Sequence, residues 1–316
     1  MTEKNIFLTG ATGSIGPYVL AELRRRGFSV TTLVRNTKTM LPGCRTVVGE
    51  LARIAELHAE IEAADGIVHL ASPRSFQPDS VLAEDIVGTG SLLTYWRAGV
   101  FVYASSPTVV HGVKQGTLDE AAPMQLDNFY DVGKFVNEFQ VRMETPPTGA
   151  GRIAAVSLRP ALFFTAGERR NQRQILSLFY KQCVQGGKFL FDSEEGLANY
   201  GSSYIGGADF ARAAADGLAA TVSGPYNVAG GFCTWRTLID TINRYAGARG
   251  DVVVRAGAIP EGGEFRVWQS RTELDTRTFS AQTGFAPRQG LEELVQEFVQ
   301  AERVSTTSKP AVKTAS

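Results

Sequence analysis

A tyrosine and a lysine four residues apart form the pair whose types and spacing are best suited to chemistry. Tyr130 and Lys134 enclose Asp, Val and Gly, and residues four apart on a helix lie on one face. An ammonium beside a phenol favours the phenolate, so Tyr130 is expected to exchange a proton nearer neutral pH than a free tyrosine, whose pKa is about 10. Because this spacing also arises by chance on helices, its meaning depends on the segments before it.

A glycine-rich turn near the start of the chain gives the pair its context. Residues 5–9 predict a buried strand, and residues 18–23 have the apolar spacing of a helix. Gly10 permits the tight turn, Gly13 lets a pyrophosphate approach the backbone, and Gly16 lets the helix pack closely. The N–H groups at the start of that helix would face the phosphates. The segment therefore predicts a dinucleotide-binding loop.

These two motifs, Gly10-x-x-Gly13-x-x-Gly16 and Tyr130-x-x-x-Lys134, resemble those of the extended branch of the short-chain dehydrogenase/reductase superfamily. That branch contains NAD(P)-dependent epimerases, dehydratases and ketone reductases. The resemblance extends over nearly the whole chain, through the segments 68–72, 103–106, 158–160 and 224–228. It implies a Rossmann-type, doubly wound parallel α/β sheet with a smaller C-terminal substrate-binding lobe. It also implies an NAD(P)-dependent oxidoreductase acting on CH–OH or C=O groups.

The apolar pattern gives the order of the elements. Strands are expected at residues 5–9, 29–34, 46–48, 66–70, 100–104 and 153–158. Helices are expected at residues 52–64, 79–98, 128–143, 172–185, 208–220, 235–246 and 291–303. The alternation in the first half predicts a parallel sheet with helices on both faces.

The domain division follows from the resemblance and from composition. Residues 1–160, joined by about 205–231, are expected to form the nucleotide-binding domain. Residues 161–204 and 232–304 are expected to form the substrate-binding lobe. The tail 305–316 is rich in Ser, Thr, Lys and Ala, which predicts disorder.

The resemblance assigns roles to three catalytic residues. Tyr130 is expected to be the general acid in carbonyl reduction and the base in the reverse direction. Lys134 is expected to hold the nicotinamide ribose and to favour the phenolate. Ser106 is expected to hydrogen-bond the substrate oxygen and stabilise developing charge, with Ser105 and Thr108 as alternatives for that role.

The same resemblance implies two sets of binding residues and no metal site. Those for the cofactor are Gly10, Thr12, Gly13, Ser14, Ile15, Gly16, Arg35, Glu50, Leu51, Leu70, Ala71, Ser72, Tyr130, Lys134, Pro160 and Leu162. Those for the substrate are Ser72, Arg74, Thr108, Phe163 and Phe164.

The end of the second predicted strand bears on the choice of cofactor. An acidic residue there hydrogen-bonds the ribose 2′-OH of NAD, whereas this strand ends in Arg35. A guanidinium would hold a 2′-phosphate through charge-assisted hydrogen bonds, with Lys38 as a second contact. We therefore expect NADP(H) to be preferred, with NAD(H) as the alternative.

Substrate class remains open between two enzyme hypotheses and a third of another kind. Nucleotide-sugar members of the branch commonly carry an Asn two residues past the Arg-Pro step and an Arg before a Tyr-Ile segment. This chain has Leu162 at the first place, and Ser202 and Ser203 before Tyr204. These losses favour an NADPH-dependent reductase of a ketone or aldehyde on a largely apolar small molecule.

The alternative is an NAD(P)-dependent nucleotide-sugar epimerase or reductase. The segments 263–266 and 274–277 resemble the C-terminal segments of that group, and Arg169, Arg170 and Arg173 could bind phosphate. A non-catalytic NADP-binding regulator is the third hypothesis, disfavoured by the intact Ser106 and the Tyr–Lys pair.

Bulk properties limit the partners. The chain has 32 basic and 32 acidic residues, which indicates neither nucleic acid nor a membrane surface as a partner. No apolar run reaches the roughly 20 residues of a membrane span, and the first strand leaves no room for a signal peptide. Three widely spaced cysteines predict free thiols in a reducing, cytoplasmic setting. The three histidines have no metal-ligand spacing, and the basic triplet 24–26 is expected to be solvated.

Helices 79–98 and 128–143 carry apolar residues beyond one face, which together with the resemblance predicts that the chain can form a homodimer.

Overall fold

The computed structural model describes residues 3–36, 41–73, 75–110, 117–123, 126–144, 151–166 and 175–307. The chain divides into two compact units. Unit 1 comprises Met1–Ala161, Gly207–Ala229 and Leu274–Pro287, and unit 2 comprises Leu162–Gly206, Gly230–Glu273 and Arg288–Ser316. The segment Leu274–Pro287 thus groups with unit 1, whereas the sequence analysis assigned all of residues 232–304 to the substrate lobe.

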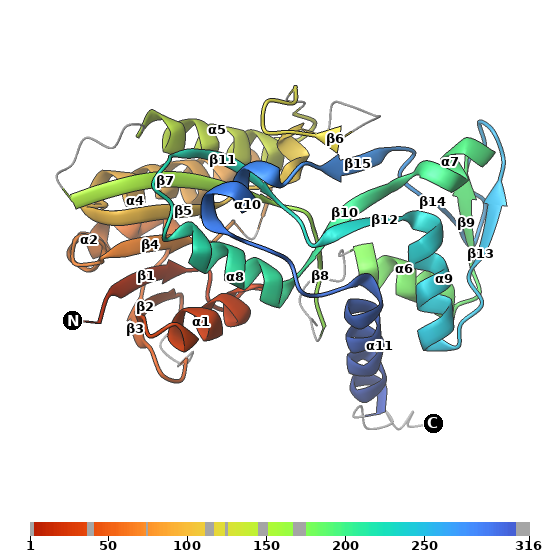
Figure 1. The fold of residues 1–316 in the computed structure, drawn as a ribbon, viewed down its shortest axis with the longest axis horizontal. Helices are drawn as coiled ribbons and strands as arrows, with labels where there is room; N and C mark the ends of the chain where they lie inside the picture. The colour runs from red at the N-terminus through yellow and green to blue at the C-terminus, as the bar shows by residue number, and fades with distance from the viewer. Residues whose placement is uncertain are drawn as a thin grey trace, which may run out of the picture. The chain divides into compact units, whose positions relative to one another are not determined.

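Unit 1 is built on a seven-stranded sheet (Figure 1). Its strands are β1 (Asn5–Thr9), β2 (Ser29–Val34), β3 (Arg45–Val48), β4 (Gly66–His69), β5 (Ala98–Ala104), β7 (Gly151–Pro160) and β11 (Gly224–Val228). They are ordered β11-β7-β5-β4-β1-β2-β3, and every pair is parallel. The strand order reverses between β1 and β4, which is where ligands bind in open α/β sheets. The predicted doubly wound α/β fold is confirmed.

The central strands are apolar on both faces, as a parallel sheet covered by helices requires. All four residues of β4 are buried, and so are the last five of β5. One core cluster of the unit gathers Phe7, Trp96, Phe101 and Tyr103 with smaller apolar residues. Burial of these large side chains is the main stabilising contribution to the unit.

Helices cover the sheet on both sides. They are α1 (Gly16–Arg25), η1 (Leu51–Leu57), α2 (His58–Glu62), α3 (Pro78–Ser80), η2 (Val81–Val87), α4 (Gly88–Tyr95), η3 (Pro107–Val110), α5 (Phe129–Met143), α8 (Gly207–Gly217) and α10 (Arg277–Thr283), with a short strand β6 (Thr117–Leu118). In Figure 1 the strands of this unit run between α4 and α5 on one side and α1 and α8 on the other.

Two predicted helices of unit 1 are interrupted. The helix expected at 52–64 is a 3₁₀ segment, η1, followed by the single turn of α2. The helix expected at 79–98 begins at Pro78, contains the π-helical segment η2, and ends at Tyr95. It ends there because Trp96 turns into the core, where its indole N–H donates to the carbonyl oxygen of Ala98 (2.7 Å).

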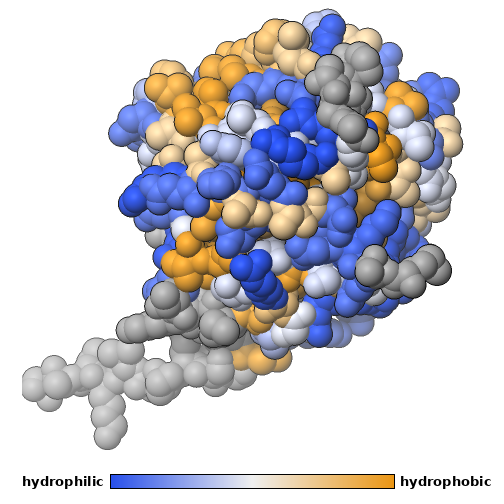
Figure 2. Space-filling model, turned by 90° about the vertical axis from the view of Figure 1, so that its left-hand side faces the viewer, coloured by the Kyte–Doolittle hydropathy of each residue, from blue (hydrophilic) through white to orange (hydrophobic). Residues whose placement is uncertain are grey.

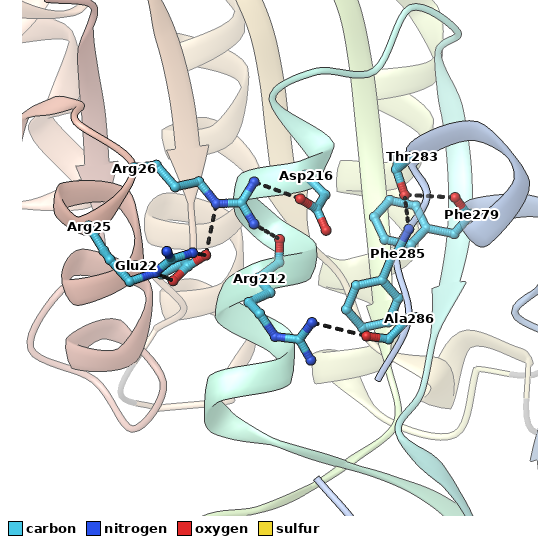
Figure 3. A network of polar contacts seen from close by, with 9 residues as sticks. All are labelled: Glu22, Arg25, Arg26, Arg212, Asp216, Phe279, Thr283, Phe285 and Ala286. Atoms are coloured by element: carbon cyan, nitrogen blue, oxygen red, sulfur yellow. Dashed lines mark hydrogen bonds and ion pairs between the residues drawn. The ribbon is translucent and has the colours of Figure 1, made fainter. Parts of the chain in front are cut away.

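Polar contacts join α1 to α8 and place the late segment in unit 1 (Figure 3). Glu22 accepts hydrogen bonds from Arg25 and Arg26, and Arg26 also pairs with Asp216 at 2.6 Å. Arg212 donates to the carbonyl oxygen of Ala286 at 3.0 Å. Arg24 donates to the carbonyl oxygen of Pro42 at 3.3 Å. The basic triplet is therefore not merely solvated, because all three of its guanidinium groups form hydrogen bonds within the unit.

Unit 2 contains shorter elements, and the sequence analysis predicted none of its strands. Its helices are α6 (Ile175–Val184), α7 (Glu194–Asn199), α9 (Trp235–Ala246) and α11 (Leu291–Thr307). Its strands are β8 (Leu162–Phe164), β9 (Lys188–Phe191), β10 (Gly201–Gly206), β12 (Gly231–Thr234), β13 (Asp251–Val254), β14 (Glu264–Arg266) and β15 (Arg271–Leu274). In one sheet β10 pairs with β12, β15 and β8, and in another β9 lies between β13 and β14. The last helix runs to Thr307, beyond the predicted start of the tail at residue 305, and residues 308–316 lie outside the described ones.

The described surface is mixed in character. On the face drawn in Figure 2, hydrophobic residues form separate patches with hydrophilic residues between them. Among the described residues, no helix combines the length and the apolar character that a membrane crossing requires.

Candidate active site

The glycine loop after β1 has a conformation that depends on its glycines. Gly10 has φ +76°, and a Cβ there would lie 2.7 Å from the backbone nitrogen of Ala71. The N–H of Gly13 donates to the carbonyl oxygen of Gly10 at 2.9 Å. A Cβ on Gly16 would collide with the carbonyl groups of Gly10 and Ala11. Side chains at Gly10 and Gly16 are thus excluded by the turn itself and by its contact with the loop after β4.

The outer side of this loop fits a phosphate group. Gly13 is exposed, and a Cβ built on it would meet only the carbonyl oxygen of Gly10, at 3.2 Å. Thr12 is exposed, Ser14 is half-buried, and Ile15 precedes the first turn of α1, where Pro17 stands. The open approach and the helix N-terminus together suit an anion. These residues therefore fit the pyrophosphate of a dinucleotide.

A buried histidine fixes the neighbouring edge of the sheet. His69 is fully buried; its Nδ1 lies 2.6 Å from Thr9 Oγ1 and its Nε2 3.0 Å from Thr89 Oγ1. The N–H of Ala71 donates to the same Thr9 hydroxyl at 3.2 Å. Burial, with the charge of Lys134, lowers the pKa of His69 to about 3. It is therefore a neutral structural residue that ties the ends of β1 and β4 together.

Next to this edge stand Leu70 and Ala71, both half-buried, and Ser72. The Ser72 hydroxyl is buried and has no hydrogen-bond partner among the described residues. A buried hydroxyl without a partner is costly, and a bound polar group would satisfy it. This is consistent with the predicted place of Ser72 beside cofactor and substrate.

The structure brings the predicted Tyr–Lys pair together on α5. The helix begins after Asn128, whose side chain accepts the N–H of Asp131 at 3.1 Å. Lys134 Nζ lies 5.7 Å from the centre of the Tyr130 ring and donates to the carbonyl oxygen of Ala104 at 3.3 Å. Lys134 is buried, whereas Tyr130 is half-buried and so open to a small molecule.

The three hydroxyls considered at the end of β5 differ in their partners. Ser105 donates to Glu138 Oε1 at 2.5 Å, and Glu138 pairs with the buried Arg159 at 2.6 Å. Ser105 is thereby held in a structural network. Ser106 Oγ lies 2.9 Å from Thr108 Oγ1, so these two hydroxyls remain the candidates for contact with a substrate oxygen.

A carboxylate that the sequence analysis missed lies below the pair. Asp85 on η2 is fully buried, and its Oδ1 is 4.0 Å from Lys134 Nζ. Burial by itself lowers the pKa of Lys134, but the charge of Asp85, helped by Tyr103 and Tyr130, more than reverses this, and the pKa of Lys134 lies above its ordinary value. The sequence feature that could have revealed Asp85 is its position four residues after Val81, on the apolar face of the predicted helix.

The residues predicted for the adenosine end lie in different environments. Arg35 is exposed and pairs with Glu84 on η2, with 3.6 Å between Nη2 and Oε2. Glu50 is exposed, while Leu51 is 3 % exposed and packs in the core of unit 1. Leu51 can therefore offer a ligand little beyond its backbone.

The last group of predicted residues follows β7. Pro160 is buried at the end of β7, and Leu162 and Phe163 are half-buried in β8. Phe164 is 1 % exposed, and its ring stacks on Tyr204 with 5.3 Å between centroids. Its assignment as a substrate contact is corrected, because it belongs to the core of unit 2. Arg74, Lys38, Arg169, Arg170 and Arg173 lie outside the described residues.

Other chemistry finds less support in the described parts of the chain. No group of three potential metal ligands occurs among the described residues. Cys44, Cys183 and Cys233 form no disulfide. A hollow of about 420 Å³ lies between α4 and α5. None of its lining residues was predicted as a site residue; they are Val87, Gly90, Ser91, Leu93, Thr94, Phe139, Gln140, Met143 and Glu144.

The fold and these motifs define a dinucleotide-binding protein of the extended short-chain dehydrogenase/reductase type. Residues 6–229 match the NAD dependent epimerase/dehydratase family. The chain therefore belongs to this family of enzymes, as the motifs predicted.

Solved structures show the same fold over nearly the whole chain. A UDP-glucose 4-epimerase from Thermotoga maritima with UDP-glucose is 18% identical, with a TM-score of 0.76, covering 96% of this chain and 99% of that one. A UDP-glucose-4-epimerase from Stenotrophomonas maltophila with bound NAD and formylated UDP-arabinopyranose is 17% identical (TM-score 0.78, coverage 97% and 100%). A short-chain dehydrogenase/reductase superfamily protein from Agrobacterium tumefaciens with bound NAD is 20% identical (TM-score 0.74, coverage 96% and 98%).

Proposed function

We propose that this protein transfers hydride between a nicotinamide cofactor and a hydroxyl- or carbonyl-bearing carbon of a small molecule, with Tyr130 moving the proton. The observation that carries this is the half-buried Tyr130 on α5 beside the buried ammonium of Lys134. The glycine loop that fits a pyrophosphate belongs to the same unit.

The chain's own residues supply binding, orientation and a proton path. Gly10, Gly13 and Gly16 would hold the dinucleotide phosphates at the start of α1, and the bound nicotinamide would supply the hydride chemistry. Tyr130 would give a proton to the substrate oxygen or take one from it. The hydroxyls of Ser106 and Thr108 would hydrogen-bond that oxygen, and Lys134 would add positive charge nearby.

The choice between NAD and NADP rests on Arg35. Its guanidinium suits a 2′-phosphate, which supports NADP(H). Glu84 opposes this, because its carboxylate lies 3.6 Å from Arg35 and would repel a second anion. The relatives described above with a named cofactor carry NAD. We therefore propose that both cofactors bind, with the preference set by the Arg35–Glu84 pair.

A nucleotide sugar is the first candidate substrate. The family and its structural relatives support this reading over a ketone reductase, because two of those relatives are UDP-glucose 4-epimerases. Arg266 is exposed on β14 in unit 2, where it could contact a phosphate. In an epimerase the hydride is returned to the same sugar, so no net oxidation or reduction of the cofactor is expected.

Reduction of an apolar ketone or aldehyde is the second candidate, and one contact favours it. The Phe76 ring packs edge-on against Tyr130, with 4.8 Å between centroids, and Phe76 is 46 % exposed. An exposed aromatic ring next to the reacting phenol would favour an apolar or ring-bearing substrate.

The two candidates can be separated with the full-length protein. The nucleotide it retains is identified after denaturation, and a panel of UDP- and dTDP-sugars is tested for interconversion without net NADH change. In parallel, NADPH consumption is followed with aromatic and alicyclic ketones. Interconversion supports the epimerase, and stoichiometric NADPH loss supports the reductase.

Tyr130→Phe tests the chemistry common to both. It should abolish turnover of whichever substrate reacts, with binding of the cofactor retained. Tyr95→Phe on α4, whose ring packs on His58, is the matched control and should leave turnover unchanged. Equal turnover in Tyr130→Phe and wild type would overturn the proposed function, whereas no turnover by either protein, with cofactor binding retained, would support a non-catalytic cofactor-binding protein.

A further inference from the structure

Asp85 occupies an environment in which a carboxylate is normally unfavourable. It is fully buried; its Oδ1 accepts from Asn137 Nδ2 at 2.8 Å, and its Oδ2 has no hydrogen-bond partner among the described residues. A buried charge is stable only when it is paired. Lys134 Nζ, 4.0 Å from Oδ1 and itself buried, provides that opposite charge.

The backbone around Asp85 is shaped to admit it. The residue lies in η2, a π-helical segment, and such segments are rare and often found at functional sites. Opposite it on α5 stands Gly133, where a Cβ would lie 2.8 Å from Asp85 Oδ2 and 2.8 Å from Val81 Cγ1. Glycine inside a helix is less favourable than alanine, so the chain accepts a weaker helix position that leaves room for the carboxylate.

Two further titratable groups beside the pair, Tyr103 and His69, carry no charge near neutral pH. On β5, burial raises the pKa of Tyr103, whose hydroxyl accepts from Asn137 at 3.0 Å. On β4, burial keeps His69 neutral, with a pKa of about 3. Lys134 and Asp85 thus form an opposite-charge pair, and the nearby buried Glu138, one turn further along α5, is neutralised by its own pair with Arg159.

We propose that Asp85 is a positioning residue of the Tyr130–Lys134 site, whose buried carboxylate keeps the Lys134 amine protonated and holds it beneath the Tyr130 ring. This inference rests on the proposed function for its catalytic meaning. Without the carboxylate, burial alone would favour the neutral amine, and the positive charge beside Tyr130 would be lost as the pH rises. Asp85 thus extends the pH range over which the site is charged for proton transfer.

The test is a titration of Lys134 that needs neither cofactor nor substrate. The full-length protein is labelled with [ε-¹³C]lysine, and the Lys134 signal is assigned by its disappearance in Lys134→Arg. In wild type this signal should titrate above the 10.5 of an ordinary lysine, whereas in Asp85→Asn it should titrate at least about one pH unit below that value. A Lys134 in Asp85→Asn that titrates at or above the ordinary value would overturn the proposal.

Glu84→Gln is the matched control, because it removes the adjacent negative charge of η2, which faces Arg35. It should leave the Lys134 titration as in wild type, and an equal shift in both variants would also overturn the proposal. Gly133→Ala is the second variant should Asp85→Asn not fold. It keeps the charge but crowds Oδ2, so the Lys134 signal should move in the same direction by a smaller amount. An unchanged signal there would count against the inference.

Activity gives an independent readout. In Asp85→Asn, turnover should fall about tenfold per pH unit above the pH at which Lys134 loses its proton, a limb that wild type lacks. A shifted Lys134 titration in a protein that turns over no substrate would refute the proposed function and leave the charge pairing supported.

Discussion

Glu22 offers a test of how the structure links charge to the stability of the nucleotide-binding unit. Its side chain is 10% exposed and accepts hydrogen bonds from Arg25 and Arg26, while Arg26 continues to Asp216 on α8 (Figure 3). The hydrogen bond from Arg25, assisted by Arg26 and opposed by burial, lowers the pKa of Glu22 from 4.5 to about 2. The perturbation is Glu22→Gln, which keeps the shape and removes the charge.

The size and sign of the effect follow from this pKa. A carboxylate whose pKa is depressed on folding stabilises the protein above the unfolded pKa, and this stabilisation is lost as the pH falls towards the folded value. A shift of this size corresponds to about 3 kcal/mol. Because Arg25 is 66% exposed, water screens the pair, and we expect about 2 kcal/mol at pH 7. About three fifths of it should remain at pH 4, and about a fifth at pH 3.

The assay is denaturant unfolding of wild type and Glu22→Gln at pH 7, 4 and 3. Glu56→Gln is the matched control, since Glu56 forms a similarly spaced pair with Arg53 in the same unit, with side chains 61% and 69% exposed. That variant should be close to neutral at every pH. A Glu22→Gln deficit no larger than that of Glu56→Gln, or one that stays constant down to pH 3, would refute the reasoning.

Three further predictions concern the cofactor and assembly. Gly16→Ala places a methyl group against Gly10 and should lower the free energy of unfolding by about 1–3 kcal/mol. It should also abolish the thermal stabilisation that NAD gives the protein. Retained stabilisation by NAD would contradict the proposal that the loop holds the dinucleotide phosphates. Arg35→Ala should weaken the binding of NADPH about tenfold or more while changing the binding of NADH little, and Glu84→Gln should strengthen NADPH binding. Fluorescence titration of each variant with the two cofactors measures both effects. An equal loss of affinity for the two cofactors in Arg35→Ala would remove the basis of the NADP assignment. We propose that the chain pairs with a second copy through the exposed apolar side of α5, where the Phe139 side chain is 55% exposed. Phe139→Glu should therefore convert a dimer into a monomer in sedimentation, and a monomeric wild type would contradict this proposal.

The strands and the glycine loop could be predicted because their signals are local. Each of β1, β2, β4 and β5 is a short apolar run bounded by turn residues, and a strand buried on both faces needs nothing more to be recognised. The helix of the Tyr–Lys pair was predicted at 128–143 and begins at Phe129, because Asn128 is a favoured N-cap. The helix at 79–98 was predicted, but its π-helical interruption could not be, since that segment depends on what packs against it.

The candidate site divides in the same way. Residue type and spacing alone determined that Tyr130 and Lys134 share a helix face behind a phosphate-binding loop. Tertiary structure decided that Asp85, 49 positions before Lys134 in the chain, lies 4.0 Å from the ammonium of Lys134. It also decided that Ser105 is held by Glu138 while Ser106 is not, and that Phe164 packs into a core. The physical reason is that helix and turn geometry repeats over a few residues and is encoded locally, whereas pairing of buried charges and filling of a core are set by contacts between segments that only folding brings together.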